Sequence, residues 1–172
     1  MRYEFKLITR IGLALILVLL PIDIFYLLLL KPTLYAASIF LGGYNPIILE
    51  DSLVINNAVL KFIPACIASL AYLLLLLLIL TTKDIEIRKR IRLFFIGSSI
   101  IFMANIIRID ALIYVYFEYG NEMFNMLHLF IWDLLSSVFV AFLWIALVKI
   151  YGIKSMPVYD DLKTLYKQAR NN

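Results

Sequence analysis

The chain has 172 residues, of which 64% are hydrophobic and only 16% are charged. A typical soluble domain is about 45–50% apolar and about 25% charged, so this chain carries more apolar surface than a soluble domain of its size buries. Its single cysteine excludes an internal disulfide, a CxxC redox centre and a cysteine-rich metal site, and its single histidine excludes motifs that need two histidines. We therefore expect an integral membrane protein with no metal site and no cofactor.

Four apolar runs are long enough to cross a bilayer as helices, since one crossing takes about 20 residues. They lie at residues 11–30, 63–80, 91–117 and 126–148. These runs predict an all-α membrane bundle of four transmembrane helices. Residues 1–150 are expected to form this single domain, and residues 151–172 a short cytoplasmic tail containing an interfacial helix.

Positive charge flanks these runs unequally. Thirteen Lys or Arg residues lie in the N-terminus, in the loop between the second and third runs and in the tail, whereas the other side has only Lys31 and Lys61. Cytoplasmic loops are enriched in Lys and Arg, so both termini are predicted to be cytoplasmic in a cell membrane. The outer connection, residues 31–62, combines turn residues with short apolar stretches, which predicts a small β-hairpin or meander.

The few polar residues within the runs gather at one level. An arginine inside a bilayer costs at least about 2.5–3.5 kcal/mol, so Arg108 needs a partner or a water-filled cavity. The rise of a helix places Cys66, Arg108 and His128 about 21, about 26 and about 30 Å above the inner ends of their runs. The only cysteine, the only histidine and the only arginine expected within the bilayer therefore converge near the outer face from three helices, since Arg92 lies at the inner boundary of its run.

These residue types suit a cysteine nucleophile. A thiol reacts as its thiolate, which a neighbouring cation or base restores in a buried site. His128 can accept the thiol proton and return it to a leaving group, while Arg108 can stabilise the thiolate or a developing oxyanion. Asn105 lies three residues before Arg108 on the same helical face, where it can orient Arg108 or donate to the same oxyanion.

Each of these residues also has a structural explanation. Cys66 can be a small apolar filler, and His128 can be a hydrogen-bonded structural residue. Arg108 can pair with Asp133, which lies at a similar depth on the neighbouring helix, alongside a catalytic role. Asp23 lies within the first run, where it either receives a bond from another helix or takes part in function.

A second class of function uses the same polar residues. A small four-span transporter or a subunit of a membrane complex would hold Asp23, Arg108 and Asp133 in an intramembrane polar network. In such a protein Cys66→Ser is silent and Arg108→Leu is damaging. In a cysteine enzyme, the loss of either Cys66 or His128 abolishes activity.

Three segments contain these residues. They are Pro64-Ala65-Cys66-Ile67-Ala68-Ser69, Asn105-Ile106-Ile107-Arg108-Ile109 and Phe124-Asn125-Met126-Leu127-His128. Their order and spacing, over residues 56–137, resemble the exosortase/archaeosortase family, and the short chain looks most like an archaeosortase. Many members follow the cysteine with Ser or Thr and then Gly, where this chain has Ile67 and Ala68.

The resemblance implies a membrane-embedded cysteine transpeptidase that acts on the outer face of the membrane. Cys66 would cleave a C-terminal sorting signal of surface proteins through a thioester, with His128 as general acid/base and Arg108 stabilising charge. The product would pass to an acceptor, expected to be a membrane lipid. The implied partners are membrane proteins that bear such a signal, and no nucleic acid is involved.

Overall fold

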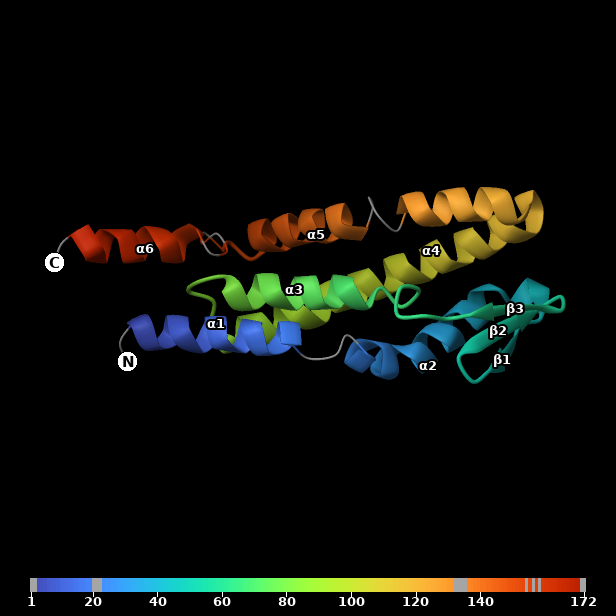
Figure 1. The fold of residues 1–172 in the computed structure, drawn as a ribbon, viewed down its shortest axis with the longest axis horizontal. Helices are drawn as coiled ribbons and strands as arrows, with labels where there is room; N and C mark the ends of the chain where they lie inside the picture. Colours follow the sequence, from blue (N-terminus) through green and yellow to red (C-terminus); the bar gives the residue numbers. More distant parts are fainter. Residues whose placement is uncertain are drawn as a thin grey trace.

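A computed structural model describes residues 3–19, 23–131, 136–153, 155, 157 and 159–170. It is elongated, with a small sheet and several helices along its length (Figure 1). In chain order the elements are α1 (Tyr3–Leu19), α2 (Asp23–Phe40), the 3-10 helix η1 (Gly42–Tyr44), β1 (Ile47–Leu49), β2 (Ser52–Ile55), β3 (Ala58–Lys61), α3 (Ser69–Thr81), α4 (Ile87–Phe130), α5 (Ser136–Ile150) and α6 (Tyr159–Arg170).

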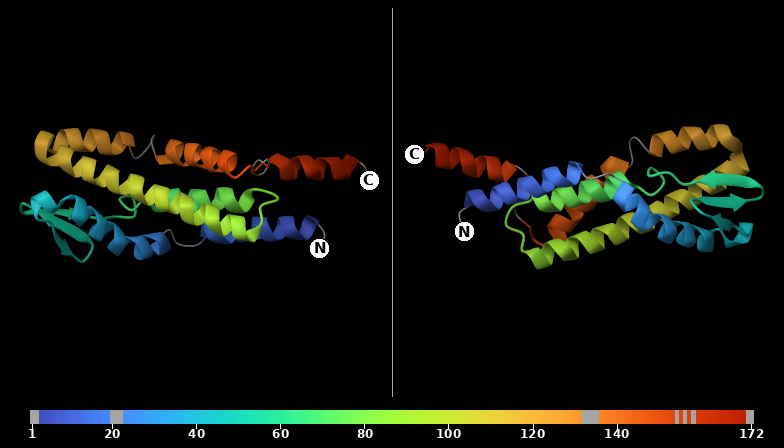
Figure 2. Two further views of the ribbon diagram at one scale, coloured as in Figure 1. Left: turned by 180° about the vertical axis from the view of Figure 1, so that it is seen from behind. Right: turned by 60° about the horizontal axis from the view of Figure 1, so that its bottom comes forward.

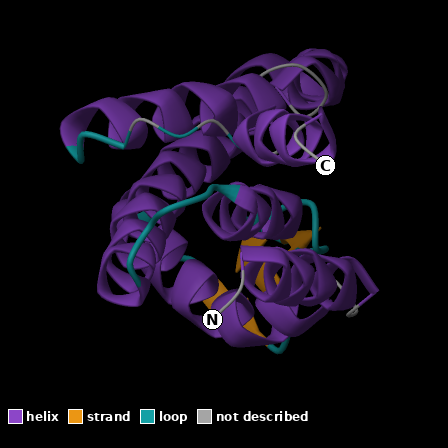
Figure 3. Ribbon diagram, turned by 90° about the vertical axis from the view of Figure 1, so that its left-hand side faces the viewer, coloured by secondary structure: helices purple, strands orange, loops and turns teal. Residues whose placement is uncertain are grey.

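The two ends of the molecule differ. Both chain termini, α6 and the turn between α3 and α4 lie at one end, and the strands lie at the other (Figure 1; Figure 2). In the end-on view of Figure 3 the strands are seen behind the helices. Between the ends, α3 packs against α1, α4 and α5. At Gly97 of α4 an added Cβ would lie 2.7 Å from a methyl group of Leu75, so glycine lets these two helices approach closely.

The outer connection forms a three-stranded antiparallel sheet in the order β1-β2-β3. Asn56 and Asn57 join β2 to β3 with φ values of 48° and 67°. Two successive left-handed residues suit the twist of a tight hairpin, and asparagine tolerates that conformation. Leu53 and Ile55 point inward and are fully buried, so one face of the sheet packs on α2 and α4.

The prediction of four transmembrane helices is wrong. Among the described residues, only α4 is by itself long and apolar enough to cross a membrane. The helices α1 and α2 are long and apolar enough to cross a membrane only when they are taken together, as a pair bent by 65°. The helix α3 has 13 residues and α5 has 15, which is shorter than the roughly 20 residues that a crossing needs.

Local breaks explain why apolar runs overestimated the spans. The first run contains Pro21, which lacks an N–H and clashes with the preceding helical turn, and the structure divides this run between α1 and α2. The helix α2 then continues through Pro32, where the outer loop was predicted to begin. Leu34 and Ala37 beyond it are fully buried, so packing outweighs the proline there. The second run loses its first residues to a turn that contains Pro64, and the fourth is divided between the end of α4 and α5.

The helix α4 reverses direction near its end. Gly120 has φ 82° and ψ −179°, values outside the helical region, and glycine adopts such a φ without steric cost. The part before Gly120 is about 50 Å long. Residues 121–131, which we call the return segment, run back alongside it and carry His128 (Figure 1; Figure 2).

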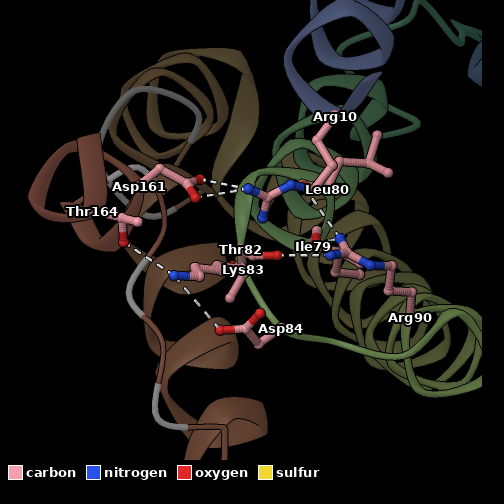
Figure 4. A network of polar contacts seen from close by, with 9 residues as sticks. All are labelled: Arg10, Ile79, Leu80, Thr82, Lys83, Asp84, Arg90, Asp161 and Thr164. Atoms are coloured by element: carbon pink, nitrogen blue, oxygen red, sulfur yellow. Dashed lines mark hydrogen bonds and ion pairs between the residues drawn. The ribbon is translucent and has the colours of Figure 1, made fainter. Parts of the chain in front are cut away.

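Arg90 closes the C-terminal end of α3. Its guanidinium donates to the carbonyls of Leu80 at 3.1 Å and Thr82 at 2.7 Å, and also to that of Ile79 (Figure 4). Its Nε donates to the carbonyl of Ile85 at 3.0 Å. The last carbonyls of a helix have no partner within the helix. One side chain therefore caps α3 and fixes its turn into α4.

The helix α6 is attached to the same end. Arg10 of α1 donates to both carboxylate oxygens of Asp161, at 2.7 and 2.9 Å, and Lys83 donates to the hydroxyl of Thr164 at 3.0 Å (Figure 4). Because both residues of the Arg10–Asp161 pair are largely buried, water screens their interaction less than it would at the surface. The tail is therefore held to α1 and to the turn that follows α3.

We expect Arg90→Met to lower the free energy of unfolding by about 3 kcal/mol, because several buried carbonyls lose a charged donor. The measurement is an equilibrium unfolding titration of the purified protein in detergent. Arg88→Met is the matched control, since Arg88 is exposed in the same turn of α4 and should change stability by less than about 0.5 kcal/mol. Equal losses in the two variants would contradict the capping role.

Candidate active site

Cys66 lies in the turn that joins β3 to α3. We call residues 62–68 the cysteine turn. The N–H of Cys66 donates to the carbonyl of Ile63 at 2.8 Å, and the N–H of Ala68 donates to that of Ala65 at 3.2 Å. The thiol is free and the residue is half-buried. The turn therefore presents a cysteine whose backbone is fixed by hydrogen bonds and whose sulfur forms no disulfide.

Two side chains from α4 hold the cysteine turn by its carbonyls. The amide Nδ2 of Asn105 donates to the carbonyl of Cys66 at 2.9 Å. One terminal nitrogen of Arg108 donates to the same carbonyl at 3.0 Å and to that of Ala65 at 3.1 Å. Asn105 and Arg108 are thus brought to the backbone of Cys66, and α4 determines where the cysteine lies.

This arrangement leaves hydrogen-bonding capacity unused. The Nε of Arg108 and the Oδ1 of Asn105 are buried and have no partner in the described part of the chain. Both residues line a cavity of about 100 Å³. The other lining residues are mostly small or apolar: Ala68, Ala71, Ile101, Ala104, Ile131 and Phe139. A charged group and a polar group therefore flank a small space between α3, α4 and α5.

Arg108 is near both other members of the predicted triad. It is close enough to Cys66 and to His128 for electrostatic interaction with each. His128 stacks on Phe124 of the return segment, with ring centroids 5.3 Å apart. Within the described ranges no hydrogen bond or ion pair joins His128 to Cys66. The structure therefore joins Cys66, Asn105 and Arg108 directly and places His128 on a neighbouring segment.

The structure does not describe the side chains of Asp133 and Asp23, the two aspartates singled out from the sequence. Asp133 lies outside the described residues, so its pairing with Arg108 stays a prediction. Asp23 is the first residue of α2, and its side chain also lies outside the described part. The polar network expected of a transporter is therefore described only at Arg108, which binds backbone carbonyls.

Sequence reasoning missed Tyr26. This residue of α2 donates its phenolic hydrogen to the carbonyl of Phe62 at 2.9 Å, and it lies close enough to Cys66 for electrostatic interaction. The cysteine turn is therefore held from α2 as well as from α4. The only signal in the sequence was a phenol within an apolar run, and its spacing did not place that run beside Cys66.

Comparison of the chain with models of protein families, with curated proteins and with solved structures finds no match. Among the described residues, no group of three or more His, Cys, Asp or Glu side chains is placed to hold a metal ion. The functional assignment therefore depends on the side chains around the cysteine turn.

Ala68 has a strained backbone at the end of this turn. Its φ is 58°, in the left-handed region that costs most residues about 1–2 kcal/mol and glycine almost nothing. A glycine at this place would therefore relieve the strain.

We expect Ala68→Gly to raise the free energy of unfolding by about 1 kcal/mol, because it relieves this strain. Ala71→Gly is the matched control, since Ala71 lines the same cavity but lies inside α3, where glycine costs about 1 kcal/mol. The two variants are compared by the same unfolding titration. A loss of stability in both would show that Ala68 is not strained.

Proposed function

We propose that this chain is a membrane-embedded cysteine peptidase or transpeptidase in which Cys66 is the nucleophile. One observation carries the proposal: Asn105 and Arg108 hold the backbone of Cys66, with the Arg108 guanidinium within electrostatic range of the thiol. A nucleophilic cysteine reacts as its thiolate, which in a buried site needs a neighbouring cation or base. The bonds to the carbonyls of Ala65 and Cys66 hold the thiol at this place.

The apolar surface supports a membrane location. Large side chains such as Leu19, Ile39 and Phe142 are 65% exposed or more, at 82%, 76% and 68%. Monomeric soluble proteins rarely expose broad apolar patches, whereas in a membrane protein lipid covers such patches. We place α4 across the cell membrane. The end that bears both termini carries most of the Lys and Arg residues, so it faces the cytoplasm, and the cysteine turn faces the outer side.

In the first chemical step His128 accepts the proton of the Cys66 thiol, and the thiolate attacks the carbonyl carbon of a peptide bond. The charge of Arg108 stabilises the oxyanion that forms. The carbon–nitrogen bond then breaks, His128 returns its proton to the leaving amine, and the acyl group remains on Cys66 as a thioester. The return segment must bring His128 to the thiol when substrate is bound, as catalytic hydrogen bonds often tighten only in the complex.

In the second step an acceptor nucleophile attacks the thioester carbon. His128 takes the proton of the acceptor and passes it to the sulfur as the carbon–sulfur bond breaks. The resemblance to archaeosortases suggests the reactants: membrane proteins with a C-terminal sorting signal as substrates and a membrane lipid as acceptor. Water in place of the acceptor would make the same site a peptidase.

Activation of Cys66 is tested by its alkylation with iodoacetamide in the reconstituted protein, followed by intact mass. We expect the reaction near pH 7 to be about tenfold faster in the unmodified chain than in Arg108→Met, because loss of the cation disfavours the thiolate. Arg92→Met, which removes an exposed charge of the same helix, should leave the rate unchanged. Equal rates in the unmodified chain and Arg108→Met would contradict an activated cysteine.

Terminal proteomics of cells that carry the chain separates the enzyme from the transporter alternative. We expect Cys66→Ser and His128→Ala to abolish C-terminal trimming of surface proteins while both variants still insert into the membrane. A transporter or assembly subunit would tolerate Cys66→Ser. Trimming that persists in cells with Cys66→Ser would therefore reject the enzymatic proposal.

A further inference from the structure

The strand β3 lies at the edge of the sheet, and its hydrogen bonds reveal which backbone groups are open. Among the described strands it pairs only with β2, with Leu60 opposite Leu53. The N–H of Phe62 donates to the carbonyl of Asp51 at 2.8 Å. Because the direction of these groups alternates along an antiparallel strand, residues 58, 60 and 62 face β2. Val59 and Lys61 therefore direct their N–H and C=O groups to the outer edge.

This open edge leads into the cysteine turn. Ile63 is the next residue in the same alternation, and its carbonyl accepts the N–H of Cys66 at 2.8 Å. The turn therefore folds over the side of β3 that no described strand occupies. A peptide lying along this edge would reach Cys66 at its end.

The edge is exposed and bordered by apolar side chains. Val59 is 64% exposed, and Ile47 and Leu49 are exposed on the same outer face of the sheet. The ammonium of Lys61 pairs with Asp51 at 3.3 Å. This pairing directs the Lys61 side chain toward the turn between β1 and β2. A hydrogen bond from Ser52, followed by the pairing with Lys61, holds the pKa of the Asp51 carboxyl below its ordinary value. The backbone of β3 thus remains open between apolar neighbours.

We propose that β3 binds an extended apolar peptide by strand addition, and that this peptide is the substrate segment beside the bond that Cys66 cleaves. The identification of this peptide as the substrate of Cys66 rests on the proposed function. Backbone bonds to Val59 and Lys61 supply affinity, and every second side chain of the peptide meets the exposed apolar face of the sheet. The competing occupant is a second copy of the chain, since open edges also pair with one another.

The test uses two probes that alkylate Cys66 in the full chain in lipid nanodiscs. One is acetyl-Val-Thr-Val-Ala chloromethyl ketone, and the other is the same peptide N-methylated at each backbone nitrogen, which blocks strand pairing. We expect the unmethylated probe to react about tenfold faster. Val59→Pro should abolish this ratio, because proline removes an outward N–H without removing a bond to β2.

Ile48→Pro is the matched control, because the same alternation turns the backbone of Ile48 to the other edge of the sheet, and the ratio should persist there. Equal rates for the two probes, or a ratio that survives Val59→Pro, would overturn the proposal. A dimer that Val59→Pro converts to a monomer, with no difference between probes, would assign the edge to a second copy. The rate at which iodoacetamide alkylates Cys66 is measured independently of the ratio between the two peptide probes. A slow alkylation rate together with an unchanged ratio would reject the proposed enzyme but support strand addition at β3.

Discussion

The buried guanidinium of Arg108 and the carbonyls of the cysteine turn depend on each other. A charge in an apolar helix is costly unless hydrogen bonds surround it, and carbonyls in an irregular turn away from water need donors. Arg108 and Asn105 provide those donors to Ala65 and Cys66 at 2.9–3.1 Å. Removing either side of the contact would leave buried polar groups unsatisfied. This mutual requirement fixes the turn against α4.

Much of the remaining architecture follows from the position of that turn. The helix α3 begins only after it, at Ser69, and so becomes a short helix in contact with α1, α4 and α5. The sheet leads into the turn from the other side through β3, whose last residue, Lys61, directly precedes it. Tyr26 secures the beginning of the turn by its bond to Phe62. The backbone around the sulfur is thereby held from two helices, while the thiol itself forms no disulfide.

Sequence spacing brought Cys66, Arg108 and His128 to one level and put Asn105 on the helical face of Arg108. The structure joins Cys66, Asn105 and Arg108 directly. The spacing did not indicate that Arg108 binds backbone carbonyls. Helical periodicity shows which residues share one face of a helix, but not which backbone groups of a neighbouring turn lie against that face. Hydropathy overestimated the spans because it counts apolar residues without regard to where helices end, as between α1 and α2, at the turn that contains Pro64 and at the reversal of α4 at Gly120. The pairing of Arg108 with Asp133, the function of His128 and the resemblance to archaeosortases stay predictions.

The contact between α4 and the cysteine turn is tested most directly by the carbonyl carbon of Cys66. The chain has a single cysteine, so ¹³C-carbonyl cysteine gives one magnetic resonance signal, which is sensitive to hydrogen bonds at that oxygen. We predict that the signal moves upfield in Asn105→Leu and in Arg108→Met, and farthest in the double variant. A signal that stays in place in the double variant would show that α4 does not hold this carbonyl, and would contradict the account.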